Sequence, residues 1–247
     1  MLTKKEVEQM RKNAKIHKKI FEEIKKITKQ WTTSNQINDM CWEIAKKHWV
    51  LCWFKWVYWF PDNICISVND EVVHWRASRN IVFKNWDLVT FDFWIKDKWL
   101  WINTDAAISL VVWWDDKNPR AAKLIQTNKK ALEAWIAQAK AWNHVWDISS
   151  AIQKEIESAW YYVVKELTWH AIWKKLHETP YIPNFWKAWK WAKLKAWMTL
   201  AIEPILWETS WKIVDEWEWE IYIEDWSLGS QYEHTILITN DEAEIII

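Results

Sequence analysis

Glycine is almost absent from this chain, which has one glycine among 247 residues. Average usage of about 7% glycine would give roughly 17 in a chain of this length. Tight turns and helix ends need a positive backbone φ, which glycine reaches without steric cost and a bulky residue reaches only with strain. A compact domain with this sequence would therefore have to form its tight turns and helix ends almost without glycine.

Other shortages narrow the class of protein. The cysteines are only three (Cys41, Cys52 and Cys65) and have no C-x-x-C spacing, which argues against a disulfide framework or a structural zinc site and fits the reducing cytoplasm. There is no run of 18 apolar residues, and the N-terminus is charged from its third residue, so neither a membrane span nor secretion is indicated. A globular cytoplasmic enzyme or scaffold remains.

The charges are balanced, with 33 Lys and Arg against 33 Asp and Glu. This balance gives no basic footprint for RNA or DNA and no acidic tail, so we expect no direct nucleic-acid binding.

Tryptophan, in contrast, is abundant, with 28 residues. One reading is a set of aromatic stacking platforms for sugars or single-stranded nucleic acid. Such platforms need a few exposed rings in one groove, whereas these residues are scattered through the whole sequence. The scatter disfavours that reading.

The pattern of apolar residues predicts an α+β domain made of two similar halves. Spacings of three and four predict a helix over 4–28, and Thr33 with Gln36 forms a capping box that predicts the start of a second helix. Runs of Val, Ile and Phe predict strands at 64–68, 88–95 and 106–112. The order then repeats, with helices over 121–141 and after Asp147 as N-cap, and strands at 161–167, 198–206, 220–223 and 234–239. We expect one domain over 1–247, with halves of about 1–118 and 119–247.

Five residues that can bind metal stand on or beside these strands: Asp92, Asp105, His170, Glu203 and Glu233. Taken singly, each reads as a half-exposed polar residue. Together they are informative, because a carboxylate inside a sheet must be paired or metal-bound to offset its desolvation. Several carboxylates with one imidazole suit Mn²⁺, Fe²⁺, Co²⁺ or Zn²⁺, and an excess of carboxylates is what two adjacent ions need.

The segments around these residues resemble a known family. They read ICISVNDEVVH at 64–74, FDF at 91–93, TDAA at 104–107, TWHAIWKKLHETP at 168–180, IPNF at 182–185, AIEP at 201–204 and SLGSQYEHT at 227–235. Over about residues 4–240 the sequence resembles the type I methionine aminopeptidases. The 33 residues from His170 to Glu203 leave no room for the helical insertion of the type II enzymes.

This resemblance implies the pita-bread (creatinase/aminopeptidase) fold, with two pseudo-symmetric αβ halves around a central antiparallel sheet. It implies two divalent ions (Co, Mn, Fe or Zn) held by the five residues above, with His74 and His177 acting on the substrate. Phe60, Cys65 and Phe185 would line a slot for the methionine side chain, with Trp219 at its edge. The implied activity is hydrolytic removal of the initiator methionine from nascent chains at the ribosome, by a monomer with no membrane contact.

The resemblance also accounts for the tryptophans, since many stand where the family has glycine. Examples are Trp31, Trp75, Trp94, Trp160, Trp169, Trp173 and Trp197. Some bacterial lineages read the UGA codon as glycine, and we interpret most of these residues as such codons translated as tryptophan, which leaves Gly229. Even a single extra methylene destabilises a packed core by about 1–3 kcal/mol. Indole side chains at this many glycine positions would therefore not be tolerated. Indoles at 75, 169 and 173 would crowd the metal cleft.

Two departures and two alternatives accompany this reading. Asp105 follows Asp92 by 13 residues where the family usually has 11, so the hairpin between them should be longer by two residues; the WRAS segment at 75–78 also differs. An Xaa-Pro aminopeptidase or dipeptidase shares the fold but usually carries an additional N-terminal domain. A non-catalytic pita-bread protein that binds ribosomes would have lost metal ligands.

Three other histidines lie outside these motifs. No metal-binding or catalytic sequence motif includes His17, His48 or His144, and we expect all three at the surface.

Overall fold

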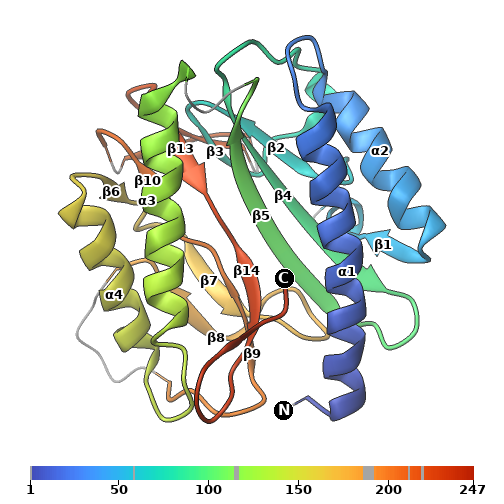
Figure 1. Cartoon of the computed structure of the whole chain (residues 1–247), viewed down its shortest axis with the longest axis vertical. Coiled ribbons are helices and arrows are strands. Elements are labelled where there is room, and N and C mark those ends of the chain that lie inside the picture. The colour runs from blue at the N-terminus through green and yellow to red at the C-terminus, as the bar shows by residue number, and fades with distance from the viewer. Residues whose placement is uncertain (1, 58, 114–116, 186–191, 211, 218–219) are drawn as a thin grey trace.

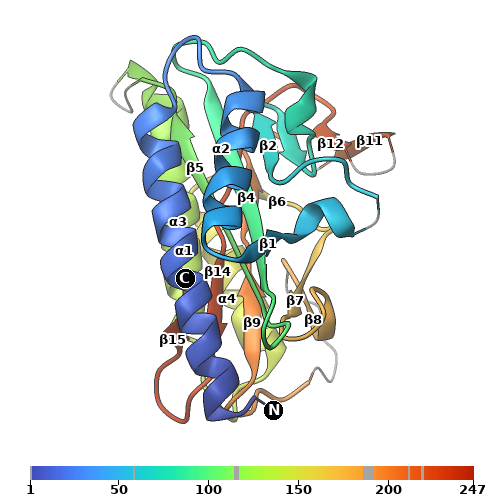
Figure 2. The same cartoon turned by 90° about the vertical axis from the view of Figure 1, so that its right-hand side faces the viewer.

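The structure is a computed structural model, which describes residues 2–57, 59–113, 117–185, 192–210, 212–217 and 220–247. Its helices are α1 (Lys4–Ile27), α2 (Ser34–Lys47), α3 (Pro119–Ile136) and α4 (Val145–Ser158), with 3₁₀ turns η1 (Trp53–Trp56) and η2 (Ala77–Arg79). Helices α1 and α2 cover one half of the molecule and α3 and α4 the other (Figure 1). Turned by 90°, α1 and α3 lie together on one side of the strands (Figure 2).

The strands form one larger antiparallel sheet in each half. The first contains β1 (Val50–Cys52), β4 (Leu88–Asp97) and β2 (Cys65–Val68) in that order, and β5 (Asn103–Val111) also pairs with β4. The second has the order β15 (Glu244–Ile245), β14 (His234–Leu237), β9 (Thr199–Ile202), β7 (Thr168–Ala171) and β8 (Glu178–Pro183). The sequence-based order of helices and strands is thus confirmed in both halves.

Two smaller sheets complete the described part of the fold. One has the order β13 (Gly229–Gln231), β10 (Ile205–Trp207), β6 (Tyr162–Val163), and the other β11 (Ile213–Trp217), β12 (Glu220–Ile223), β3 (Glu71–Val73). The second of these joins the halves, because β3 belongs to the first and β12 to the second.

The two halves also meet where β5 runs beside the segment leading into β14. Ala107 and Glu233 pair through their backbones, with Glu233 N–H donating to Ala107 O at 3.0 Å and Ala107 N–H donating to Glu233 O at 3.4 Å. We call this line of contact between β5 and residues 231–235 the seam. The seam places the functional segments of both halves side by side.

Helix starts follow the predicted capping. The Thr33 side chain accepts from the N–H of Gln36 (3.3 Å) and the Gln36 side chain accepts from the N–H of Thr33 (2.9 Å), which confirms the capping box. Helix α4 begins earlier than predicted: its N-cap is His144, and Asp147 lies at the third helical position, where it accepts from the His144 N–H at 2.8 Å. An Asp can stabilise a helix from either position, so the sequence pattern did not separate them.

Each helix pair packs on its own apolar core. Met10, Ile20 and Ile24 of α1 are buried with Phe91 and Phe93 of β4, and the apolar faces of α3 and α4 form the corresponding core of the second half. Within the described residues, none of the helices has the length and apolar character needed to cross a membrane.

The prediction that His17 lies at the surface is wrong. Its side chain is buried in the first core, and its Nε2 lies 3.0 Å from the carbonyl oxygen of Thr104. The helical face that carries His17 also carries Met10, Ala14 and Phe21, so its position in the helix period explains the burial. His48 is exposed and His144 half-buried.

Left-handed backbone conformations are concentrated at tryptophan. Among the described residues, thirteen residues other than glycine have a positive φ, and ten of them are tryptophans: Trp31, Trp49, Trp59, Trp86, Trp101, Trp113, Trp142, Trp160, Trp197 and Trp226. A residue with a Cβ adopts this conformation at a cost of roughly 1–2 kcal/mol. The fold therefore needs glycine-like freedom at the places where the sequence has indoles.

Candidate metal centre and substrate pocket

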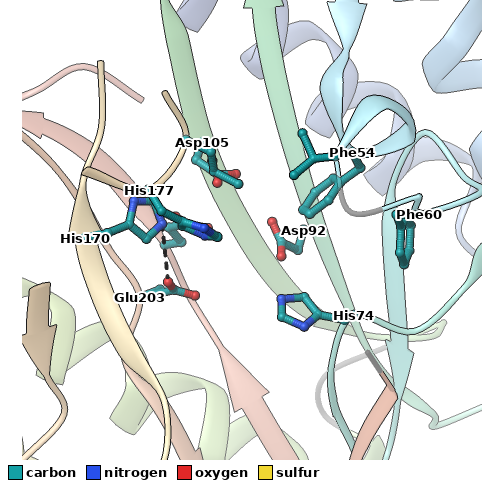
Figure 3. Close-up of a pocket in the computed structure, with 11 residues that line it drawn as sticks. Phe54, Phe60, His74, Asp92, Asp105, His170, His177 and Glu203 are labelled. Atoms are coloured by element: carbon teal, nitrogen blue, oxygen red, sulfur yellow. Dashed lines mark ion pairs between the residues drawn. The ribbon is translucent and has the colours of Figure 1, made fainter. Parts of the chain in front are cut away.

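A cavity of about 90 Å³ opens between the two halves (Figure 3). It is lined by Phe54, Val57, Phe60, His74, Asp92, Asp105, His170, Leu176, His177, Glu203 and Glu233. All five predicted metal ligands and both predicted substrate histidines are in this set. The structure thus brings together residues that span 160 positions of sequence, from His74 to Glu233.

The first half contributes two carboxylates through one hairpin. In the β4–β5 register Asp92 lies opposite Ala107 and Asp105 lies opposite Trp94, so the two aspartates are diagonal neighbours on the same face. The 13-residue step from Asp92 to Asp105 is accommodated by a loop that follows Asp97. The Asp97 carboxylate accepts hydrogen bonds from the backbone N–H groups of Trp99, Leu100 and Ile102 at 2.7–2.8 Å. The longer hairpin therefore still places Asp105 in the cavity.

The second half contributes an imidazole and two carboxylates. His170 is on β7, opposite Ala201 of β9, while Glu203 directly follows β9 and Glu233 directly precedes β14. The His170 Nε2 lies 3.9 Å from Glu203 Oε1, the pair marked in Figure 3. The other Glu203 oxygen accepts from the side-chain amide of Gln231 at 2.9 Å. Three neighbouring strand ends thus point these side chains at one place.

The donor set fits a cation. One ligand atom each of Asp105, His170 and Glu233 lies within 4.8 Å of the others. In addition, buried carboxylate oxygens of Asp92, Asp105 and Glu233 have no hydrogen-bond partner. A buried acceptor without a partner is costly, and bound cations would satisfy these oxygens.

Burial and mutual repulsion set the protonation of these groups. Burial raises the pKa of Asp92 to about 7. It also raises the pKa of Asp105, Glu203 and Glu233 well above the ordinary value, and the neighbouring carboxylates add to the effect. Burial lowers the pKa of His170 to about 3, with a further contribution from His177. The imidazole is therefore neutral, as a metal ligand must be, and no positive charge among the described residues lowers the pKa of these carboxylates.

His74 and His177 face the cavity from opposite halves. His74 follows β3 with a φ of 62°, a left-handed conformation, and in Figure 3 it lies on the side of Asp92. The His177 ring lies edge-on to the His170 ring with 4.5 Å between their centroids. Burial lowers the pKa of His177, so this ring is neutral near pH 7.

One end of the cavity is apolar. Phe54 and Phe60 contact each other with ring centroids 5.6 Å apart, and Val57 and Leu176 complete the lining. The sequence interpretation found Phe60 but missed Phe54, Val57 and Leu176. Leu176 could have been found from its place beside His177, whereas Phe54 and Val57 lie in the irregular stretch around η1, where no periodic pattern indicates which side chains point inward.

Two other residues predicted for this slot, Cys65 and Phe185, are not among the described residues that line the cavity. Cys65 is fully buried in the cluster that contains Phe54 and Phe60, behind the cavity wall. Phe185 packs on the core of the second half and is not among the lining residues, so its contact with substrate stays a prediction. Trp219 lies outside the described residues.

Trp75, Trp169 and Trp173 were expected to crowd the cleft, and this expectation is wrong. None of them lines the cavity. Trp75 donates through Nε1 to the carbonyl of Ile221 at 2.7 Å, and Trp169 packs against Trp135.

This arrangement, with two halves around a pocket rich in carboxylates, is that of the metallopeptidase family M24, whose family model matches residues 8–240. The chain belongs to this family. Among its relatives, the methionine aminopeptidase of Clostridium acetobutylicum is 30% identical over 98% of this chain and 95% of the relative. The methionine aminopeptidase of Mycoplasma capricolum is 36% identical over 78% of this chain and 76% of the relative.

Solved structures agree in fold. The methionine aminopeptidase of Thermotoga maritima superimposes with a TM-score of 0.93 at 32% identity, covering 99% of this chain and 97% of that one. The prolidase of Pyrococcus horikoshii gives a TM-score of 0.75 at 17% identity, and 99% of this chain matches only 62% of the prolidase. The predicted α+β pita-bread fold is confirmed, and the Xaa-Pro peptidase alternative, which shares the fold alone, is not favoured.

Proposed function

We propose that this chain is a metal-dependent aminopeptidase that removes the initiator methionine from newly made polypeptides. One observation carries the proposal: a single cavity has carboxylate oxygens without hydrogen-bond partners at one end and an apolar lining at the other. The methionine aminopeptidases of Clostridium acetobutylicum and Thermotoga maritima match at 30% and 32% identity over nearly the full length of both chains, which supports the same function.

Asp92, Asp105, His170, Glu203 and Glu233 would hold two divalent ions, of Co, Mn, Fe or Zn. Four carboxylates carry the negative charge that two such ions require, and the unpartnered oxygens of Asp92, Asp105 and Glu233 supply free ligand positions. When bound, the ions act as Lewis acids and lower the pKa of water, so that a nucleophile is available near neutral pH.

His74 and His177 would act on the substrate. Each is a cavity-lining imidazole, one from each half, so they would contact a bound peptide from two sides. A neutral imidazole can donate one N–H to the carbonyl oxygen or amide of the scissile bond, where it stabilises the charge that develops during attack. Lowering of the His177 pKa by burial keeps that ring neutral at the pH of the cytoplasm.

The apolar end of the cavity would hold the methionine side chain. Phe54, Val57, Phe60 and Leu176 give an apolar lining without a charged group, which suits an unbranched thioether and excludes charged side chains. Cys65 supports Phe54 and Phe60 from behind. The free α-amine of the substrate would lie at the metal centre at the other end of the cavity, which would limit removal to a single residue.

We also propose that the protein acts as a monomer in the cytoplasm, on N-termini that emerge from the ribosome. Initiator methionine is added at the start of synthesis, so the ribosome is where the substrate first occurs. Cys41, Cys52 and Cys65 are all free thiols, as expected in a reducing compartment.

Most tryptophans of this sequence would be glycine in the organism, encoded by UGA. The support is the backbone: ten described tryptophans have a positive φ, which glycine adopts freely. Peptide mass spectrometry of the native protein over Trp169 and Trp173 tests this, and two indole masses there would contradict it.

The activity is tested with protein made with glycine at the proposed UGA positions. We expect release of Met from Met-Ala-Ser, loss of the activity on chelation, and its return with Mn²⁺ or Co²⁺. An Ala-Pro dipeptide serves as the control substrate for the prolidase-type alternative. Cleavage of Ala-Pro without cleavage of Met-Ala-Ser would overturn the proposed function.

A further inference from the structure

The loop between β7 and β8 carries His177 into the cavity, and part of its conformation is fixed from within the second half. The Ile172 N–H donates to Thr199 O at 3.0 Å. One carboxylate oxygen of Glu178 accepts from the N–H groups of Lys174 and Lys175, at 3.0 and 2.9 Å. These three hydrogen bonds give the backbone N–H groups of residues 172, 174 and 175 their acceptors. They also fix the backbone of the turn just before His177.

The carbonyl groups of the same loop are held by the other half of the molecule. The Trp173 carbonyl accepts from both the backbone N–H and the side-chain amide of Asn103, at 2.8 and 2.7 Å. The Lys174 carbonyl accepts from the Lys96 ammonium at 3.1 Å. All three bonds end on backbone oxygens, so they form whatever side chain position 173 carries.

Lys96 and Asn103 are direct partners in the register at the turn end of the β4–β5 hairpin, next to the loop that joins the two strands. We call these two side chains the clasp. Both are buried, and a lysine is seldom buried without a partner for its charge. A third contact, between Lys174 Nζ and Glu6 Oε1 of α1 at 3.5 Å, also ties the loop to the first half.

We propose that Lys96 and Asn103 are positioning residues for His177. The clasp holds the carbonyls of residues 173 and 174 against the hairpin that bears Asp92 and Asp105, and so fixes the distance between the His177 imidazole and the metal centre. The hairpin thus has two tasks: its strands carry two carboxylates, and its end orients a histidine of the opposite half. The inference rests on the proposed function insofar as His177 acts on substrate.

The first test compares Lys96→Met with Lys98→Met in the full chain. Lys98 lies two residues further along the same hairpin and is exposed, so its replacement is the matched control. We expect Lys96→Met to lower kcat about tenfold with little change in KM and in metal content, because a catalytic donor moves by a fraction of an ångström. Lys98→Met should behave as wild type. Full activity of Lys96→Met would overturn the proposal.

A double-mutant cycle then separates positioning of His177 from a general structural effect. If Lys96 acts through His177, Lys96→Met should cause no further loss in a His177→Ala background. An equal loss in both backgrounds would overturn the proposal. Asn103→Ala, which keeps the backbone N–H bond to residue 173, is the second variant and should repeat the pattern with a smaller loss; it also serves if Lys96→Met does not fold.

Amide hydrogen exchange gives a readout that needs no activity. The clasp variants should raise exchange in residues 172–177 and leave β9 and β14 as in wild type, while Lys98→Met should change nothing. If amide exchange of residues 172–177 is unchanged in the Lys96 and Asn103 variants, the proposed positioning role of the clasp is wrong, even if the enzyme is active. An increase confined to this loop in a protein without methionine-releasing activity would support the clasp and refute the proposed function.

Discussion

The side-chain hydroxyl of Thr235 makes two hydrogen bonds with the backbone of Asp105 across the seam. It accepts from the Asp105 N–H at 2.9 Å and donates to the Asp105 carbonyl at 2.7 Å. One side chain thus replaces the strand partner that Asp105 would have in a continuous sheet. Because Ala107 pairs directly with Glu233 two residues away, the backbones of two proposed metal ligands are fixed relative to each other.

Thr235→Val should therefore weaken metal binding. The change keeps the shape of the side chain but removes both hydrogen bonds, at a cost of about 2 kcal/mol in stability, and we expect metal affinity to fall at least about tenfold, as for other residues that orient ligands. Thr235→Ser keeps the hydroxyl and should bind metal as wild type does. Calorimetric titration with Mn²⁺ and urea unfolding measure the two effects; equal affinity in the Val and Ser variants would contradict the role.

Asp105→Asn tests the proposed ligand at the end of the long hairpin spacing. Removing one charge from four carboxylates should leave fewer than two ions bound and reduce activity by at least about a hundredfold, because the ions supply the nucleophile. Metal analysis after dialysis, with kinetics on Met-Ala-Ser, gives both quantities. Two bound ions with near-normal activity would show that Asp105 is not a ligand.

His74→Ala and His177→Ala should keep both ions and the fold while kcat falls by about 10²–10³, the usual loss when one donor to a developing charge is removed. KM should change less than kcat, since the bond strengthens in the transition state. Steady-state kinetics with metal analysis decides the roles. Loss of an ion in either variant would make that histidine a ligand.

Replacing Trp160 by glycine should stabilise the protein made with the sequence as written. Trp160 has a φ of 65° and is 88% exposed, so glycine relieves backbone strain and gives up almost no packing. We expect a gain of about 1 kcal/mol in the free energy of unfolding. Trp42→Gly, inside helix α2, is the control and should lose about 0.5 kcal/mol or more. Urea unfolding compares them, and a loss at Trp160 would refute the strain.

Acid should destabilise the protein through His17. Burial lowers the pKa of this imidazole to about 3, whereas in the unfolded chain it is near 6.5. The unfolded state therefore takes up the proton first, so the contribution is complete above pH 6.5 and is lost as the pH falls from 6.5 towards 3. Between pH 7 and 5 we expect wild type to lose about 2 kcal/mol more than His17→Gln. Urea unfolding of the metal-free proteins at both pH values measures the difference, and parallel losses would contradict it.

Regular elements with a local pattern could be predicted from the sequence. Helix α1 and the start of α2 follow from the apolar period and the Thr33 cap, and β4 and β5 follow from long runs of Val, Ile and Phe. The four carboxylates among the proposed ligands were found because carboxylates are unusual in such strands, and His170 was found with them as an imidazole beside a predicted strand. All of them reach the cavity, although the sequence alone gave no distance between them.

Elements defined by long-range contacts could not be predicted. Strands β7 and β8 are short and hold Trp169, Thr179 and Pro180, so nothing local marks them as strands of a sheet. The clasp is another example, because the Lys96 side chain finds its acceptor at residue 174, 78 positions away. His17 differs from both: its spacing from Met10 and Ala14 indicated burial, and the polar residues beside it in sequence obscured that signal.

The division of the cavity between the two halves has a consequence for the order of events during synthesis. Asp92 and Asp105 emerge from the ribosome early, but His170, Glu203 and Glu233 come from the second half, and Glu233 stands just before β14. A growing chain has no complete site until residue 233 has left the ribosome and has paired with Ala107. The proposed ligands of the two halves can therefore meet only after most of the chain has been made and the second half has folded against the first.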